Sequence, residues 1–550
     1  MACRGGWAWL AAIILLPAQP ALAEWQEAKS PHFIVYANDK PDRIRAFMTR
    51  LEKFDRAMRV LFGVADTGES SSLRLTIYVV DNEDDVANLA GKGGSGVAGF
   101  YRARANGAVA FVPRKSNQDT GSDFDLKSEI VLLHEYTHHF TASNWPNLAV
   151  PPWFSEGFAE FNATALFNKD GGVTMGSPPL YRATEILDPS MPMKRIISAN
   201  LDDLSLEKKV QVYGRGWLLT HYILLNSERR KLFQDYLTAL NSGKSPIEAA
   251  AVFGDLDALD RELNRYAAKR LQGFTLKPQD FQIGQIDVVP LSAGAAAVMP
   301  VWLLSERGVN KSLAPKVYAL AQKLAAPFPD DPTAQGVLAE AAYDADQLDA
   351  AKAAAARAIA ADPKNFHALI YKGRVAMAIA MRDHLSDSAT WDAVRASFLA
   401  ANKIDTENAE PLLLFYQSFV VTGAVPTKNA QAALAYAYQL APFDRRLRMS
   451  AAIMFLNQKK AEEAREALGP VAYDPHGGAL AEIAKRALAA LAAGDSAAAL
   501  GAMRGNSPAA GGNADGDGDT PNDGASGGPK DGAKKGPGAT GKSGGQTPPS

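Results

Sequence analysis

Residues 134–138 read H-E-Y-T-H and residues 153–161 read W-F-S-E-G-F-A-E-F, and these two stretches decide how the chain is interpreted. On a helix, positions i and i+4 lie on one face, so the imidazoles of His134 and His138 can bind one tetrahedral metal ion. Glu135 then lies beside the open coordination position. The first stretch therefore predicts a metal site on a helix.

Apolar spacing and chain breaks predict that both stretches are helical. The first helix is expected to follow Asp125, a suitable N-cap, and to end near Ser143–Pro146. The second is expected to start at Pro151-Pro152, because proline fits the first turn of a helix. Its phenylalanines turn Glu156 toward the core, which makes Glu156 the expected third ligand. Glu160, one turn further on, either accepts the second N–H of a ligand histidine or is solvated. A surface position, or one supporting the ligands, is expected for His139.

With seventeen residues between His138 and Glu156, the two stretches resemble the gluzincin metallopeptidases, which include the small peptidase MA-like domains of bacterial proteins. The resemblance covers residues 134–161 and implies a zincin-like α+β domain. It also implies one zinc ion per chain held by His134, His138 and Glu156, with Glu135 as general base. Glu160 falls where thermolysin-like members carry an acid behind the ligands.

The resemblance is weaker downstream of residue 161. The aminopeptidase branch of the family has a Y-E-K-G segment whose tyrosine binds the oxyanion, whereas residues 213–217 here read Y-G-R-G-W. Tyr213 is therefore the candidate oxyanion donor, with His221 and Tyr222 as runners-up, and buried packing is the alternative for all three. Because no G-A-M-E-N-like segment is found, an aminopeptidase assignment does not follow.

The predicted chemistry is hydrolysis of amide bonds without a covalent intermediate. Zinc with three protein ligands keeps a fourth position for water and lowers the pKa of that water toward about 7. Glu135 takes the proton and can return it to the leaving amine, while a tyrosine or histidine donor stabilises the carbonyl oxygen. The only cysteine is Cys3 and no G-x-S-x-G motif is found in residues 24–506, so no nucleophile competes. A zinc endopeptidase acting on peptide or protein is expected.

Residues 1–23 have the pattern of a secretory signal peptide. Arg4 supplies the positive region, Trp7–Leu16 the apolar core, and Ala21-Leu22-Ala23 a cleavage site before Glu24. A retained membrane anchor is the alternative, although the apolar core is short and no later run is long enough to span a bilayer. An exported protein, periplasmic or extracellular in a bacterium, is expected. The formal net charge of −2 predicts no binding to nucleic acid.

The remaining chain divides into four parts. Residues 24–285 are predicted to form the mixed α/β peptidase domain, and residues 286–311 a linker or helical connector.

Within the first part, Asn106-Gly107 predicts a hairpin turn. The family resemblance makes residues 108–112 the candidate sheet edge for binding extended peptide, with an ordinary strand as the alternative. The glycines of residues 91–96 are expected to form a mobile flap. Residues 507–550 lack large apolar side chains and are expected to be disordered.

Residues 312–506 are predicted to form helical repeats. The segment at Ala358–Pro363 recurs at Ala401–Thr406 and Ala437–Pro442, with spacings of 43 and 36 residues. These repeats resemble tetratricopeptide (TPR) repeats, with an insertion near Arg382–Trp391 and small residues where helices pack closely. Three to five helix pairs should stack into a curved solenoid that recruits a substrate or protein partner, and a generic helical domain is the alternative.

Two other functions compete with the peptidase prediction. In one, the repeats act as a periplasmic scaffold or adaptor and the peptidase domain is structural or inactive. In the other, zinc-dependent hydrolysis acts on a substrate such as cell-wall peptide. Because Glu135 is dispensable for binding metal, an intact H-E-x-x-H together with Glu156 argues against the scaffold alternative.

Overall fold

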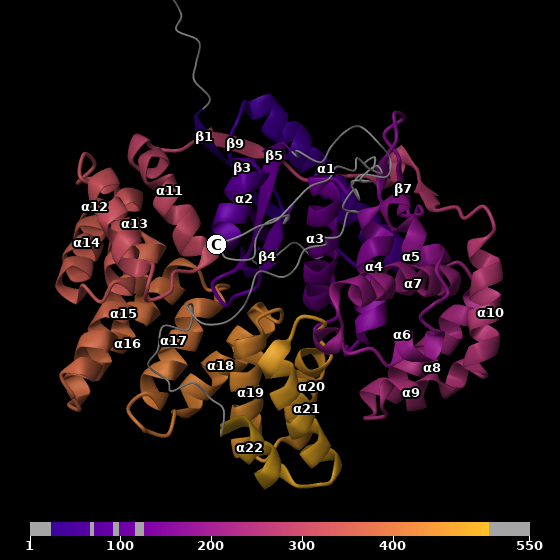
Figure 1. Cartoon of the computed structure of the whole chain (residues 1–550). Coiled ribbons are helices and arrows are strands. Elements are labelled where there is room, and N and C mark those ends of the chain that lie inside the picture. The colour runs from indigo at the N-terminus through magenta and orange to yellow at the C-terminus, as the bar shows by residue number, and fades with distance from the viewer. Residues whose placement is uncertain (1–23, 67–70, 92–97, 116–125, 505–550) are drawn as a thin grey trace, which may run out of the picture.

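The computed structural model describes residues 24–66, 71–91, 98–115 and 126–504. The predicted signal peptide, the tail after residue 506, the glycines after Gly91 and the predicted N-cap Asp125 lie outside these residues. Two parts follow one another along the chain (Figure 1): an N-terminal mixed domain built on a sheet, and an array of helices that curves around it.

A six-stranded sheet with the order β4-β5-β3-β2-β1-β9 is the centre of the mixed domain. Its strands are β1 (Trp25–Lys29), β2 (Phe33–Asn38), β3 (Leu75–Asn82), β4 (Phe100–Arg102), β5 (Ala108–Lys115) and β9 (Asp287–Pro290). The pairs β2–β3 and β3–β5 are parallel, and the other pairs are antiparallel.

Helices cover both faces of this sheet. On one face, α1 (Pro41–Phe62) and α3 (Ser128–Asn144) pack against Ala108, Ala110 and Val112 of β5. On the other, α2 (Glu83–Ala90) and α11 (Ala293–Arg307) pack against Val109 and Phe111. Because side chains alternate between the two faces, the first six residues of β5 are all buried.

The hairpin prediction is confirmed, but the edge prediction is wrong. Strands β4 and β5 pair antiparallel around Asn106-Gly107, and Gly107 has φ 128°, a conformation that favours glycine. However, β5 lies between β3 and β4, and its residues 109–111 are already paired on both sides. The edge of the sheet is β4, and residues 108–112 form an ordinary interior strand.

The two helices of the metal motif follow β5 in the chain. Helix α3 begins at Ser128 after Lys127, so it starts later than the sequence suggests, and it ends before Trp145. Helix α4 (Pro152–Ala163) begins at the predicted Pro152. Its neighbour is α7 (Leu206–Leu224), which crosses it at two glycines, Gly157 and Gly216. A Cβ atom on either glycine would overlap a backbone carbonyl of the other helix, so the crossing requires glycine at both positions.

Smaller elements complete the mixed domain. Its other helices are α5 (Ala183–Leu187), α6 (Met193–Ile197), α8 (Ser227–Asn241), α9 (Pro246–Ala249) and α10 (Leu256–Ala267). A second sheet consists of β6 (Leu166–Phe167), β7 (Val173–Met175) and β8 (Phe274–Leu276). The segment 286–311, expected to be a connector, supplies β9 to the main sheet and α11 to its face, so it is part of the mixed domain's packing.

The repeat array, defined here as α12 to α22, contains five successive antiparallel helix pairs from α13/α14 to α21/α22. Its helices are α12 (Ala314–Ala325), α13 (Pro332–Asp344), α14 (Leu348–Ala361), α15 (Phe366–Arg382), α16 (Ser388–Ile404), α17 (Ala409–Val420), α18 (Lys428–Leu440), α19 (Arg445–Asn457), α20 (Ala461–Ala472), α21 (Gly478–Ala492) and α22 (Ser496–Arg504). The extra length predicted near residues 382–391 lies largely in longer helices: α15 and α16 have 17 residues each, against 13 in α13 and 14 in α14. Ala339, Ala351 and Ala358 are fully buried between neighbouring helices.

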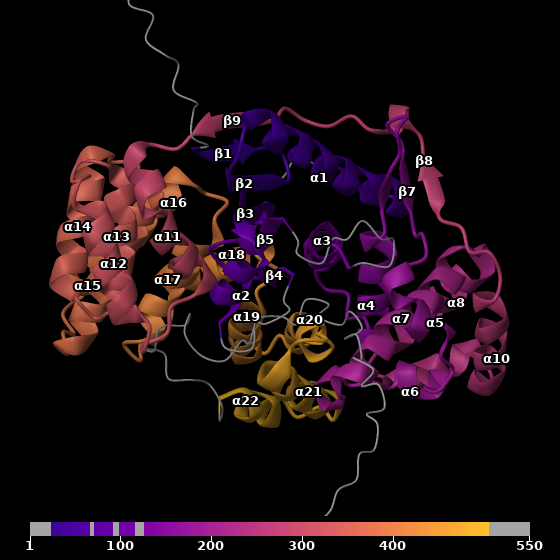
Figure 2. The same ribbon diagram turned by 45° about the horizontal axis from the view of Figure 1, so that its top comes forward.

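The array returns to the mixed domain at its far end. Figures 1 and 2 show it starting beside α11 and curving round until α19–α21 lie next to the metal-motif helices. Buried residues of α17–α22 belong to the same apolar cluster as α1, α3, α4 and α7. Polar contacts across this boundary include Ser72 Oγ to Leu440 O at 2.6 Å, Tyr438 OH to Asn147 Oδ1 at 2.9 Å, Asn147 Nδ2 to Glu466 Oε2 at 3.2 Å, and Arg448 Nη2 to Pro146 O. The array is therefore not a freely attached appendage.

Within the described residues, none of the helices combines the length and the apolar character needed to cross a lipid bilayer.

The close crossing of α4 and α7 leads to a stability prediction. Gly157→Ala should lower the free energy of unfolding by about 3 kcal/mol, because the added methyl group overlaps the Gly216 carbonyl and Thr220. Gly501→Ala is the matched control: Gly501 lies in α22 with open space around it, and alanine there should be neutral or stabilising by up to about 1 kcal/mol. Urea unfolding measures both variants, and equal stabilities would contradict the tight crossing.

Candidate metal centre

The side chains of His134, His138 and Glu156 converge between α3 and α4. His134 Nε2 lies 3.2 Å from His138 Nε2 and 3.2 Å from Glu156 Oε2, and His138 Nε2 lies 3.7 Å from Glu156 Oε1. Ligand atoms of a tetrahedral zinc ion lie about 3.4 Å apart, given zinc–ligand bonds of about 2.1 Å. The three residues therefore have both the donor types and the spacing of a three-ligand site.

The site is buried, and its carboxylate requires compensating charge. Glu156 is 0% exposed and His134 is 4% exposed. Burial alone would raise the pKa of Glu156, but the neighbouring imidazoles of His138, His134 and His476 hold it well below its usual range. Burial lowers the pKa of His134, yet the hydrogen bond and charge of Glu156, with Glu160 and Glu135, raise it to about 9. In His138 the effect of burial outweighs the charges of Glu156 and Glu135, so the pKa of its imidazole is lowered.

One oxygen of the carboxylate supports the fit of a cation. Glu156 Oε1 is buried, and its neighbours among the described residues include His476 Nε2 at 3.3 Å and His138 Nε2 at 3.7 Å, neither in hydrogen-bonding geometry. A buried carboxylate oxygen without a donor is costly, and a cation between the imidazoles and the carboxylate would satisfy it. His134, His138 and Glu156 are thus the residues that could hold a metal ion.

The second nitrogen of each ligand histidine also has a neighbour. Ser155 Oγ lies 3.3 Å from His138 Nδ1, and Glu160 Oε1 lies 4.0 Å from His134 Nδ1. Glu160 is fully buried and accepts hydrogen bonds from Tyr181 OH at 2.5 Å and from Arg182 Nε at 3.1 Å. Glu160 is therefore not solvated, and it lies where a group orienting His134 would be.

Glu135 and Tyr213 lie on the same side of the site as the ligands. Glu135 is 3% exposed, and its charge acts to raise the pKa of His134 and that of Tyr213. The ring of Tyr213 lies 6.1 Å from the ring of His134, and Arg182 lies over its other side at 5.4 Å. Burial raises the pKa of Tyr213 well above its usual value, so its hydroxyl stays protonated and can donate a hydrogen bond.

The runners-up lie elsewhere. His221 Nδ1 contacts Tyr266 OH at 2.9 Å and its Nε2 contacts Gln272 O at 3.2 Å, and burial lowers its pKa to about 4, so it is a neutral packing residue. Tyr222 lies under the guanidinium of Arg229, 3.4 Å from the ring centroid. Of the three candidate donors, Tyr213 alone lies at the metal motif.

His139 is neither a surface residue nor a neighbour of the ligands. It is 2% exposed, its Nδ1 lies 3.0 Å from Tyr101 OH, and its Nε2 lies 2.8 Å from Leu73 O. Its ring also packs against Phe443 of the repeat array, with centroids 5.0 Å apart. His139 therefore connects α3 to β4, to the start of β3 and to the array.

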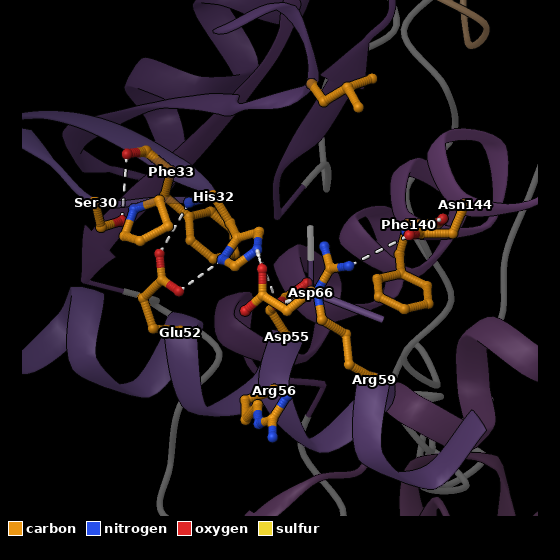
Figure 3. Close-up of polar contacts among 12 residues, drawn as sticks. Ser30, His32, Phe33, Glu52, Asp55, Arg56, Arg59, Asp66, Phe140 and Asn144 are labelled. Atoms are coloured by element: carbon orange, nitrogen blue, oxygen red, sulfur yellow. Dashed lines mark hydrogen bonds and ion pairs between the residues drawn. The ribbon is translucent and has the colours of Figure 1, made fainter. Parts of the chain in front are cut away.

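A buried charge cluster behind α3 holds the motif in place (Figure 3). His32 Nδ1 lies 2.8 Å from Glu52 Oε2, and its Nε2 lies 3.4 Å from Asp55 Oδ2. Asp55 also accepts hydrogen bonds from Arg59 Nε at 2.7 Å and from the hydroxyl of Tyr136, inside H-E-Y-T-H, at 2.7 Å. His32, Glu52 and Asp55 lie close enough to hold a metal ion. However, both oxygens of Asp55 already have donors, so a charge cluster fits these residues better.

The repeat array adds a residue that sequence reasoning missed. His476 lies in the connection between α20 and α21, and its Nε2 is 3.3 Å from Glu156 Oε1. Its ring centroid lies 6.3 Å from that of His138. A single histidine between two repeat helices carries no spacing signal. Only the curvature of the array, which brings residue 476 back to residue 156, reveals its place.

A cavity of about 680 Å³ lies between the mixed domain and the array. Its wall includes His138 and Ser155 at the metal motif, Arg102 at the end of β4, Arg104 after it, and His476. Further along, residues of α13, α15, α17 and α19 line it. The cavity therefore joins the metal motif to the inner surface of the repeats.

Comparisons with known proteins identify no family for this chain. No family model and no curated protein matches it. Among solved structures it is similar to a thermophilic TPR protein of Thermus thermophilus, with 15% identity, a TM-score of 0.30, and coverage of 36% of this chain and 99% of that one. It is also similar to pilF of Pseudomonas aeruginosa, with 13% identity and a TM-score of 0.30. That match covers 38% of this chain and 88% of the other. At this TM-score the likenesses carry no argument, and the repeat architecture rests on the helices described above.

Proposed function

We propose that this chain is a zinc-dependent peptidase whose repeat array binds substrate or a partner protein. The observation that carries the proposal is the convergence of His134, His138 and Glu156, with Glu135 next to the first ligand. A buried carboxylate facing two imidazoles at ligand spacing is hard to explain by packing alone, because burying charge is costly. The family resemblance of residues 134–161 supports the same assignment.

Zinc bound here would supply a Lewis acid that polarises a carbonyl group and makes water more acidic. Glu135 is the base that accepts the proton from the attacking water and returns it to the leaving amine. The hydroxyl of Tyr213, protonated because of its burial, donates a hydrogen bond to the carbonyl oxygen as negative charge develops there. Glu160 and Ser155 keep the two imidazoles oriented.

The cavity supports a peptide or protein as substrate. It extends from His138 to the inner surface of the array, and β4 lies at the adjacent edge of the sheet. An extended peptide could pair with β4 in the manner that the sequence suggested for β5. The cavity wall then offers side chains from both parts of the chain.

One observation favours the alternative, a scaffold with an inactive peptidase domain. The repeat array packs over the metal motif, and Glu135 and Glu156 are almost completely buried. A protein used only as a scaffold could tolerate such a closed site. The two functions differ in whether the carboxylate of Glu135 is needed.

The first prediction concerns metal content. Purified wild-type protein should contain about one zinc ion per chain, and His138→Ala or Glu156→Ala should lose it because each removes a ligand. Glu135→Gln should retain zinc. Glu129→Gln, on the same helix and paired with Arg50, is the matched control and should also retain it. Elemental analysis measures the content, and full retention in Glu156→Ala would move the third ligand to another residue.

The second prediction separates enzyme from scaffold. Glu135→Gln should lower the rate of peptide hydrolysis by about 10²-fold or more, because the base is lost while the ligands stay. Unfolding stability should remain near that of wild type, and Glu129→Gln should keep wild-type activity. The scaffold function would be supported instead if Glu135→Gln fully complemented a deletion strain.

The third prediction concerns export, which we propose to the periplasm or the extracellular space of a bacterium. Cleavage after Ala23 should leave Glu24 as the N-terminal residue of the exported protein. N-terminal sequencing of that protein checks the site. Recovery of Arg4 from it would contradict cleavage and favour a retained anchor.

A further inference from the structure

We propose that His476 is a fourth protein ligand of the metal ion, so that the repeat array closes the metal centre from within the same chain. The inference rests on the proposed zinc site and adds to it a residue from the other part of the chain. His476 Nε2 lies 3.3 Å from Glu156 Oε1, close to the separation of about 3.4 Å between two ligand atoms on one tetrahedral zinc ion. It is an imidazole nitrogen, the donor type already used twice at this site. His134, His138 and Glu156 have ligand atoms within 4.8 Å of one another and His476 is not in that set, so its imidazole completes the tetrahedron by a shift toward the two histidines.

The position of His476 is held by its own loop. The His476 N–H donates to Asp474 Oδ1 at 2.8 Å, and its carbonyl accepts a hydrogen bond from Arg445 Nη1 at 2.5 Å. Arg445 also lies 3.5 Å from Asp474 Oδ1. Because both backbone groups of His476 are hydrogen-bonded, its loop is held close to Glu156 before any metal binds.

The loop is in turn fixed to the mixed domain. Helices α19 and α20, on its N-terminal side, contact the turn between α3 and α4 through Arg448 and Glu466. Gly469 of α20 packs against Ala149 in that same turn. The segment that separates the ligand helices is therefore the segment on which the array is docked.

A fourth protein ligand has a chemical consequence. Structural zinc sites have four protein ligands, whereas catalytic sites keep one position open for water or substrate. With His476 bound, no position would be left open for water, so hydrolysis would occur only in the molecules in which His476 is displaced. Peptide cleavage then requires His476 to leave the metal, which couples activity to movement of the α20–α21 connection.

The test uses full-length protein loaded with Zn²⁺ or Co²⁺. In His476→Ala, zinc affinity measured against a chelating dye should fall by about tenfold or more. The visible absorption of the Co²⁺ form should change in band position and intensity, because water replaces an imidazole as the fourth ligand. Hydrolysis of a short peptide at saturating zinc should increase severalfold. His476→Gln should behave like His476→Ala, since glutamine can donate a hydrogen bond to Glu156 but cannot replace the imidazole as a ligand.

The matched control is His384→Ala. His384 also belongs to the array, in the connection between α15 and α16, but it is exposed and does not line the cavity, and all three readouts should remain at wild-type values. Unchanged affinity and spectrum in His476→Ala would overturn the proposal, as would full rescue by glutamine or a fall in hydrolysis with an unchanged spectrum. If wild-type protein binds neither metal, the zinc site itself fails, and this outcome is distinguishable because Glu156→Ala then also has no effect.

Discussion

The buried carboxylate of Glu156 is the constraint on which the rest of the structure depends. It is 0% exposed and must be ionised to bind metal, yet an isolated charge in such a place would cost several kcal/mol. The chain places imidazoles from two distant segments around it: His134 and His138 from α3, and His476 from the repeat array. The need to compensate one charge thus links the mixed domain to the array.

Two further features keep the ligand helices at the right separation. The contact between Gly157 and Gly216 brings α4 close to α7, which places Tyr213 beside the ligands. Behind α3, Tyr136 donates to Asp55, so the charge cluster of α1 fixes the rotation of the helix that carries both ligand histidines. Gly157 follows Glu156 in the sequence, and Tyr136 follows Glu135, so each feature lies next to a functional residue. This explains why a motif of a few residues predicts so much of the local structure.

The local elements could be predicted from the sequence, and the long-range neighbours could not. The spacing of H-E-Y-T-H, the proline at the start of α4 and the Asn106-Gly107 turn each act within a few residues, so α4 and the hairpin appear where expected. The order of the strands depends on which strand pairs with each side of β5, and short-range patterns do not reveal this. The structure places β4 at the edge of the sheet, where the sequence suggested β5. His139 was expected on the surface or in support of the ligands, but it is buried and packs against Phe443 of the array. Ser155 and His476 could not be recognised because their roles depend on helix crossings and on the curvature of the array.

The central claim is that one metal ion lies between α3 and α4. Diffraction from crystals grown with zinc, measured on both sides of the zinc absorption edge, locates that ion directly. The account predicts one anomalous peak within about 2.2 Å of Nε2 of His134, Nε2 of His138 and the carboxylate of Glu156. A peak at His32, Glu52 and Asp55 instead, or no peak between α3 and α4, would contradict it.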